Sequence, residues 1–189
     1  MKQSKTSKFA YLAGVIDGDG TIGIYRKGDV DKNYPGQGRG LSLYVLTIAV
    51  GQKRGPIIDW LYGNFGGKIY IKTQVTSVPN SKKIYNHQMY EWKLNKLEDI
   101  EYVLKRILPF LHEKKDQAEL ALQFINKRIQ VNKTGIKNGF IVKYPEDVMA
   151  NWIEFAAQKS NELKHLKRKF VPCAAVETKF LEPSIDGKL

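Results

Sequence analysis

Two aspartates in a short glycine-containing segment are the residues of this sequence best suited to chemistry. Asp17 and Asp19 stand near the end of Leu12-Ala-Gly-Val-Ile-Asp-Gly-Asp-Gly20. Hydrophobic residues recur before them at spacings of three and four, which predicts a helix, and the glycines are typical of a helix end. Carboxylates there meet the partly negative end of the helix dipole, which favours a bound cation. A structural turn is the alternative. A calcium-binding loop is excluded, because Ile22 and Gly28 stand where that loop needs glycine and glutamate.

The same nine residues resemble the signature motif of the LAGLIDADG homing endonucleases, from which they differ at Val15 and Gly18. The resemblance implies hydrolysis of DNA phosphodiester bonds that depends on Mg²⁺, for which Mn²⁺ can substitute. It implies that Asp19 and Gly18 bind the metal and that Asp17 is mainly structural.

Two further segments resemble the single-motif, homodimeric branch of this family. Gln52 ends the second predicted strand, and the resemblance puts it beside the metals, together with a basic residue for which Arg54 is the candidate. The segment from Leu108 to Ala118 resembles the family's helix start, whose lysine reaches the cleavage site and corresponds to Lys114. The implied catalytic residues are therefore Asp19, Gln52, Lys114 and Arg54.

The charge balance points to nucleic acid as the partner. The chain has 189 residues and a formal net charge of +12, from 31 Lys and Arg against 19 Asp and Glu, and such an excess suits a polyanion. A membrane surface is the weaker alternative, because no strongly apolar basic helix and no long apolar segment is visible. We expect double-stranded DNA as the partner, no membrane and no small-molecule substrate.

Length and cysteine usage indicate one intracellular domain. A chain of this size supports one sizeable core, so we predict a single domain over residues 1–171 and a flexible tail over 172–189. The only cysteine, Cys173, excludes an internal disulfide. No secretory signal is visible, which favours a reducing compartment, either the cytoplasm or an organelle.

Hydrophobic periodicity predicts an α+β fold. Alternation predicts four strands, at Thr21–Lys27, Leu41–Gln52, Lys68–Lys72 and Tyr85–Leu94. After the first helix, helical patterns begin at Pro56, Glu98, about Glu113 and Pro145. The order matches the αββαββα arrangement of the LAGLIDADG fold, a curved antiparallel four-stranded sheet with helices on one side.

The strand alternation also predicts one polar sheet face. Long polar and aromatic groups of this kind suit major-groove base edges and phosphates, and in the family this face lies along DNA. An ordinary solvated face is the alternative. The predicted DNA-binding residues are Tyr25, Lys27, Thr47, Lys68, Tyr70, Lys72, His87, Glu91 and Lys93.

Small residues in the first helix predict a close helix pair. Ala10, Ala13 and Gly14 leave one helix face almost without side chains, and the apolar run is too short to span a bilayer. Pairing this face with its copy across a two-fold axis would bring two Asp19 residues together beneath the DNA, one for each strand.

Together these features predict a homodimeric, site-specific homing endonuclease that cuts both strands of a long pseudo-palindromic DNA target. By resemblance it would be associated with an intron or an intein. The alternatives are an RNA-splicing maturase and a non-catalytic DNA-binding regulator on the same fold. The two motif acids argue against the regulator.

Overall fold

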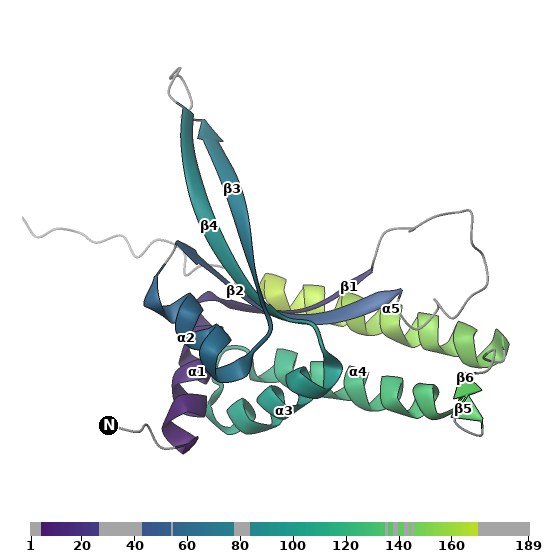
Figure 1. The fold of residues 1–189 in the computed structure, drawn as a ribbon. Helices are drawn as coiled ribbons and strands as arrows, with labels where there is room; N and C mark the ends of the chain where they lie inside the picture. Colours follow the sequence, from purple (N-terminus) through teal and green to yellow (C-terminus); the bar gives the residue numbers. More distant parts are fainter. Residues whose placement is uncertain are drawn as a thin grey trace, which may run out of the picture.

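The computed structural model describes residues 5–26, 43–53, 55–77, 84–134, 136–137, 140–141, 144 and 146–169. Its helices are α1 (Lys5–Asp19), α2 (Pro56–Phe65), α3 (Leu97–Ile107), α4 (Lys115–Thr134) and α5 (Glu146–Lys169). The main strands are β1 (Gly20–Arg26), β2 (Tyr44–Lys53), β3 (Lys68–Ser77) and β4 (Ile84–Leu94). A short 3₁₀ turn, η2 (Leu108–Phe110), precedes α4, and a small hairpin of β5 (Ile136–Lys137) and β6 (Phe140–Ile141) follows it. The predicted αββαββα order and α+β class are confirmed (Figure 1).

The four main strands form one antiparallel sheet in the order β1-β2-β4-β3. Side chains alternate between its two faces, as the period of two requires. One face joins the hydrophobic core, where Leu46, Ile48 and Val50 of β2 and Trp92 of β4 are fully buried. The helices α1, α3 and α4 lie on this side, and the hairpin of β3 and β4 extends beyond the rest of the sheet (Figure 1). Among the described residues, no helix covers the other face.

Helix α1 is anchored to the core by a stripe of four residues. Phe9, Leu12, Ala13 and Ile16 are buried, at the spacings i, i+3, i+4 and i+7 of one helix face. Ala13 has no exposed surface, so its predicted place in a dimer seam is wrong. The reason is that packing inside the monomer turns this position inward.

The exposed side of α1 carries its other small residues. Ala10, Gly14 and Gly18 are exposed and follow one another at steps of four, and we call them the α1 stripe. A Cβ atom added at Gly14 or Gly18 meets no atom within 4 Å. Beside the stripe, the half-exposed ring of Tyr11 packs edge-on against Trp60, with ring centroids 4.7 Å apart. Of the three residues predicted for a close helix pair, Ala10 and Gly14 therefore lie on the α1 stripe.

A glycine makes the abrupt change from α1 to β1 possible. A Cβ atom at Gly20 would lie 2.6 Å from Cα and 2.9 Å from the carbonyl oxygen of Ile16. Only glycine allows the strand to start directly against the last helical turn. The junction holds Asp19 at the end of the helix and at the rim of the sheet.

Helix α5 lies along β1, the strand at one edge of the sheet (Figure 1). Ser160, which is buried, donates a hydrogen bond of 2.8 Å to the carbonyl oxygen of Ile24. The helix thus covers a strand edge whose backbone groups would otherwise be open to pairing with another chain. None of the described helices combines the length and apolarity needed to cross a bilayer.

Candidate active site and nucleic-acid interface

Asp19 and Gln52 come together at the junction of helix and sheet. Asp19 ends α1, and Gln52 lies near the end of the neighbouring strand β2. The amide nitrogen Nε2 of Gln52 donates a hydrogen bond of 2.5 Å to Oδ2 of Asp19. The Asp19 carboxylate is exposed, so the pair is open to a ligand. Two residues predicted to act at one site are therefore in direct contact.

Asp17 points the other way and binds the segment before α4. Its Oδ2 accepts a 2.8 Å hydrogen bond from the backbone N–H of His112, and its Oδ1 accepts one of 3.0 Å from that of Lys114. Hydrogen bonds to a charged acceptor are stronger than neutral ones. Asp17 thus ties the end of α1 to a segment more than ninety residues further along the chain.

Replacing Asp17 by Asn is expected to destabilise the protein by about 1–3 kcal/mol, because an amide has one acceptor oxygen for two N–H donors and its NH₂ group opposes the second. For a chain of this size, that lowers the melting temperature by roughly 2–4 °C per kcal/mol. Thermal unfolding followed by circular dichroism measures the effect. Asp59→Asn is the matched control, because Asp59 is exposed on α2. Equal melting temperatures for the two variants would contradict the anchoring role.

Lys114 caps the C-terminal end of α1. Its Nζ donates hydrogen bonds of 2.6 Å to the carbonyl oxygens of both Ile16 and Asp17, where a cation also meets the negative end of the helix dipole. Burial lowers the pKa of Lys114, while the negative charges of Asp17, Asp19 and Glu113 oppose that shift. The lysine therefore acts on Asp19 through its charge, with two of its three N–H donors already bound to backbone.

The open face of the sheet forms a groove of about 800 Å³ that begins at Asp19, which we call the sheet groove. Each main strand contributes to its lining, and neighbouring strands are in a register that sets Glu91 of β4 between Gly51 of β2 and Tyr70 of β3. Lys72 shares this face by strand parity. Residues from the predicted DNA-binding set that line the groove are Tyr25, Thr47, Tyr70, Glu91 and Lys93.

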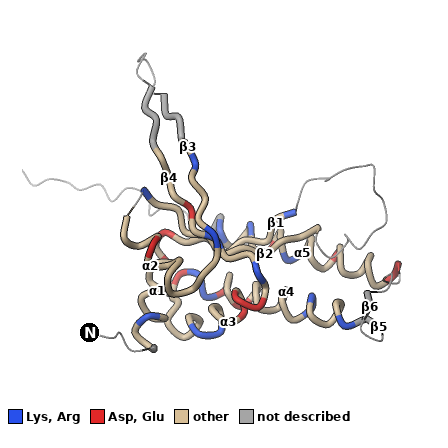
Figure 2. Tube along the Cα trace, viewed as in Figure 1, with Lys and Arg blue, Asp and Glu red and all other residues tan. Residues whose placement is uncertain are grey.

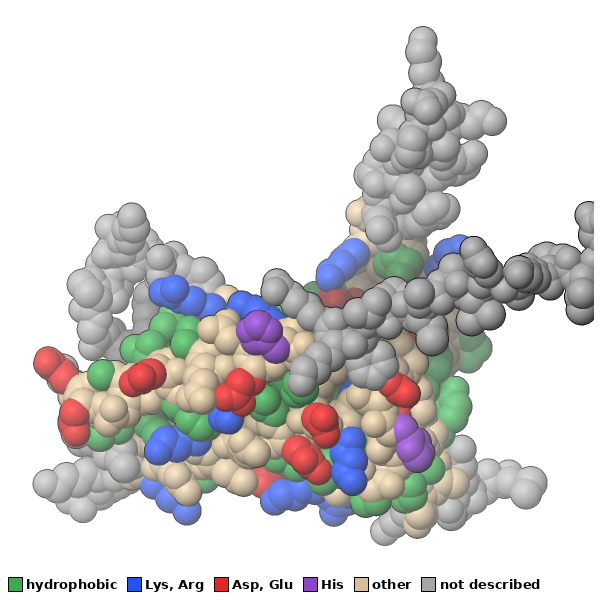
Figure 3. All heavy atoms as spheres, turned by 180° about the vertical axis from the view of Figure 1, so that it is seen from behind, with side chains coloured by type: hydrophobic (Ala, Val, Ile, Leu, Met, Phe, Trp, Pro, Cys, Tyr) green, Lys and Arg blue, Asp and Glu red, His purple; other side chains and the backbone are tan. Residues whose placement is uncertain are grey.

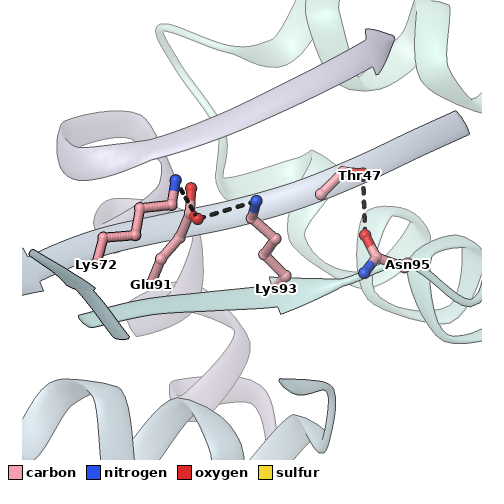
Figure 4. A network of polar contacts seen from close by, with 5 residues as sticks. All are labelled: Thr47, Lys72, Glu91, Lys93 and Asn95. Carbon is pink, nitrogen blue, oxygen red and sulfur yellow. Dashed lines mark hydrogen bonds and ion pairs between the residues drawn. The ribbon is translucent and has the colours of Figure 1, made fainter. Parts of the chain in front are cut away.

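Glu91 joins two lysines on the sheet face. Its Oε2 lies 2.6 Å from Nζ of Lys72 and 2.9 Å from Nζ of Lys93, and both lysines point toward it (Figure 4). Burial opposes ionisation of Glu91, but the hydrogen bonds and charges of the two lysines outweigh it and hold the pKa of that carboxyl below its usual value. Lys93 also lies 5.4 Å from the centroid of the Tyr70 ring. The cluster keeps two cations in fixed positions above the groove.

Glu91→Gln is expected to strengthen binding to DNA of arbitrary sequence, because it releases Lys72 and Lys93 from their shared carboxylate. Each newly neutralised phosphate steepens the fall of log affinity with log salt concentration by about 0.9. Fluorescence anisotropy with a labelled duplex over a KCl series measures both quantities. Glu119→Gln is the control. It also removes one negative charge, and Glu119 is exposed on α4. If both variants show the same slope, the lysines do not reach phosphates.

The remaining predicted site residues divide into three groups. Thr47 lies on the expected face but is 8% exposed and donates its hydroxyl proton to Oδ1 of Asn95 at 3.0 Å, so that donor is not offered to DNA (Figure 4). Lys68 is exposed opposite Lys93, as its strand parity requires. Lys27, Arg54 and the side chain of His87 lie outside the described residues.

The donor set at Asp19 fits Mg²⁺ that takes further ligands from water or a substrate. Among the described residues, no group of three or more His, Cys, Asp or Glu side chains could hold a metal ion. Mg²⁺ usually takes one or two protein carboxylates and completes its shell with waters and substrate phosphates. The exposed Asp19 carboxylate is a hard oxygen ligand, and the last carbonyl groups of α1, including that of Gly18, have no acceptor role within the helix. A metal here would take its other ligands from water or from a bound substrate.

Sequence reasoning missed three polar residues near the sheet groove. Asn95 and Arg128 both line it, and Arg128 donates a 2.8 Å hydrogen bond to the carbonyl oxygen of Tyr44. Lys167, near the end of α5, has its Nζ 5.6 Å from the centroid of the Tyr25 ring. No local pattern marks these three, because Asn95 and Arg128 reach the groove, and Lys167 reaches the Tyr25 ring, from elements outside the sheet.

Basic side chains lie on the sheet as well as on the helices. Lys and Arg mark the point where β3 and β4 leave the body of the protein (Figure 2). From behind, basic side chains are seen along the upper edge near the sheet and again over the helices below it, where acidic side chains lie among them (Figure 3). The basic groups at the sheet suit a polyanion held there.

Two solved structures of the homing endonuclease I-CvuI are similar to this chain. One is its complex with the I-CreI target in the presence of 2 mM Mg, with the DNA not cleaved. It has a TM-score of 0.54 and 22% sequence identity, over 85% of this chain and 82% of the other. The second is I-CvuI with its own target in the presence of 2 mM Ca, with a TM-score of 0.52 and 23% identity over the same shares. No protein-family model and no curated protein sequence matches the chain. The chain therefore has the homing endonuclease fold, as the sequence resemblance predicts.

Proposed function

We propose that this protein is a homodimeric, Mg²⁺-dependent endonuclease that cuts a specific double-stranded DNA target. The observation that carries the proposal is the contact between Asp19 and Gln52 at the end of the sheet groove. The contact would join a carboxylate able to bind a metal to a surface able to bind DNA. The likeness to I-CvuI, whose solved structures are complexes with target DNA in the presence of 2 mM Mg or Ca, supports the proposal.

The residues of this chain would divide the work as follows. Asp19, with the carbonyl group of Gly18, would hold the metal, which supplies charge neutralisation at the phosphate and activation of water when bound. Gln52 fixes the orientation of the Asp19 carboxylate through its amide N–H and would direct a water with the rest of its amide. Lys114 would add positive charge near the developing negative charge. Mn²⁺ offers the same octahedral oxygen preference, so it should replace Mg²⁺.

Cutting both strands needs two such sites, which is the reason for proposing a dimer. One chain carries one Asp19, and the exposed α1 stripe beside it offers a surface for close approach of a second α1. A two-fold axis through this stripe would bring both Asp19 residues under one DNA duplex and would make the target pseudo-palindromic.

Selection from a library of pseudo-palindromic duplexes tests the proposal. Incubation with and without Mg²⁺, followed by sequencing of the cut ends, should yield one family of related sites cut on both strands only when the metal is present. Specific binding without cleavage in either Mg²⁺ or Mn²⁺ would favour a DNA-binding regulator. Tighter binding to structured RNA than to any duplex would favour a maturase.

A further inference from the structure

We infer that Lys167 of α5 contacts a DNA phosphate at the cleavage site around Asp19. The inference deepens the proposed function and rests on it, because it assigns a role in the same reaction to a residue outside the motif and outside the sheet. Four observations lead to it: the position of α5 along β1, the helix face that carries Lys167, its ring contact, and the absence of a carboxylate partner for it among the described residues.

The contact between α5 and β1 fixes where Lys167 lies. Ser160 is hydrogen-bonded to the carbonyl oxygen of Ile24, and α5 runs antiparallel to β1 (Figure 1). Lys167 is seven residues further along, which is about 10 Å at 1.5 Å per helical residue. In a strand, about 10 Å corresponds to three residues. Counted back from Ile24 toward the start of β1, this distance brings Lys167 to the level of Thr21. Thr21 lies two residues after Asp19 and lines the sheet groove.

The same helix face carries Ser160 and Lys167. A spacing of seven residues returns to nearly the same side of a helix, so Lys167 faces β1 as Ser160 does. Leu163, at i+3 on this side, is buried. Lys164, one turn before Lys167, is exposed instead. The two lysines therefore have different surroundings on one helix.

The ring of Tyr25 directs Lys167 toward the groove. This ring folds back over Gly23, where a Cβ atom would collide with it, so the aromatic group points along β1 toward Asp19. The Nζ of Lys167 lies 5.6 Å from the ring centroid. A cation at this distance from a ring face is attracted to it, and Tyr25 lines the groove that also contains Asp19.

Within the described residues no carboxylate compensates the charge of Lys167. Burial lowers its pKa, and the positive charge of Lys114 lowers it further. By contrast, Lys159 on the same helix lies 2.7 Å from Glu162. A half-buried lysine whose described neighbours are a ring and another cation carries an energetic cost, and an anion would relieve that cost. The anion that the proposed reaction brings to this place is a DNA phosphate.

Lys167 also complements Lys114. The ammonium group of Lys114 is bound to two backbone carbonyl oxygens, which leaves one donor for a ligand. Lys167 has its donors available on the β1 side of Asp19. Two lysines near one phosphate would divide the roles of holding the helix end and neutralising the phosphate.

Four proteins test the inference: the parent, Lys167→Met, Lys167→Arg and the matched control Lys164→Met. Single-turnover cleavage of a duplex from the library selection is measured in Mg²⁺, and binding of the same duplex is measured in Ca²⁺ over a KCl series. We expect Lys167→Met to slow cleavage by about a hundredfold and to reduce the log–log salt slope by about 0.9 per protomer. Lys167→Arg should retain the slope, and Lys164→Met should behave as the parent.

Thermal stability separates contact with DNA from a structural role. Without DNA, Lys167→Met should melt at or above the parental temperature, because it keeps the aliphatic stem and removes an uncompensated charge. A fall of several degrees in both Lys167 variants would assign a structural role and overturn the inference. The inference would also be overturned if Lys167→Met cleaved at the parental rate with the parental salt slope. Losses of cleavage rate and salt slope in Lys164→Met equal to those in Lys167→Met would overturn it as well.

The two proposals fail differently in this experiment. If the parent cuts no duplex of the library, the proposed function fails, while the salt slopes with any bound duplex still test the phosphate contact. If the parent cuts and Lys167→Met cuts equally fast, only the inference about Lys167 fails.

Discussion

Asp19→Asn should abolish cleavage and leave specific DNA binding within about tenfold of the parent. The substitution keeps an oxygen that can accept the hydrogen bond from Gln52, so the local structure should persist. It removes the negative charge that a divalent metal needs, and a metal's stabilisation of the transition state is worth several kcal/mol. A loss of about 4 kcal/mol corresponds to roughly a thousandfold in rate.

The binding side of this prediction has its own physical reason. Specific binding rests on the sheet face and its cations, which Asn at this position does not touch. In the absence of metal, two fewer carboxylates per dimer lie beside the phosphates, which relieves like-charge repulsion. The affinity of the variant should therefore depend less on Mg²⁺ than that of the parent.

The measurement pairs a gel-shift titration with a nicking assay on one duplex, each in Mg²⁺ and in Ca²⁺. Asp59→Asn, the same change at an exposed position of α2, controls for the loss of one negative charge. If Asp19→Asn cuts at close to the parental rate, the metal site is wrongly assigned, and the regulator or maturase becomes the better description.

Gly14→Leu should prevent dimerisation while the monomer still folds. A side chain at Gly14 meets no atom within 4 Å inside the monomer, and leucine has a higher helix propensity than glycine by up to about 1 kcal/mol. The monomer should therefore be at least as stable as before. Across a two-fold axis, however, two leucines would enter one close contact, and overpacking costs about 1–3 kcal/mol for each.

Sedimentation velocity in parallel with thermal unfolding checks this prediction. Gly63→Leu is the matched control, because Gly63 is an exposed helical glycine of α2 that also meets no atom within 4 Å. We expect Gly14→Leu to sediment as a monomer and Gly63→Leu as a dimer. Only Gly63→Leu should then cut both DNA strands. If Gly14→Leu sediments as a dimer like the parent, the dimer contact lies elsewhere. If both proteins sediment as monomers, there is no such contact.

Residue patterns correctly predicted the four main strands, but not the hairpin of β5 and β6. In the strand predicted at Thr21–Lys27, Ile22 and Ile24 are buried and Tyr25 is exposed, as alternation requires, whereas Ile69 and Ile71 of β3 are exposed. The helical pattern that begins at Pro56 ends before Gly66, which has a positive φ of 66°. These features depend on neighbours within a few positions, so a local period is enough to define them. The single domain over residues 1–171 stays a prediction.

The candidate site was predicted from a resemblance. The likeness of Leu12–Gly20 to the LAGLIDADG signature, with a glutamine at the end of a later strand, led to the metal and nuclease predictions, which stay predictions. The side chains of Asp19 and Gln52 are in contact. Strand length and parity brought the glutamine to the rim, since β1 and β2 are paired with Gly20 opposite Val50. A short signature can therefore predict which side chains meet before any distance is known.

Only the tertiary structure decided which way the ambiguous side chains turn. Ala13 and Gly14 are equally small and adjacent, yet one is fully buried and the other exposed, because the direction in which α1 packs depends on the whole core. Lys114 reaches α1 carbonyl groups 97 and 98 residues away, and Lys167 reaches Tyr25 from the last described helix. Such contacts join elements distant along the chain, and no sequence period records them, since they exist only once hydrophobic packing has fixed the relative positions of helices and sheet.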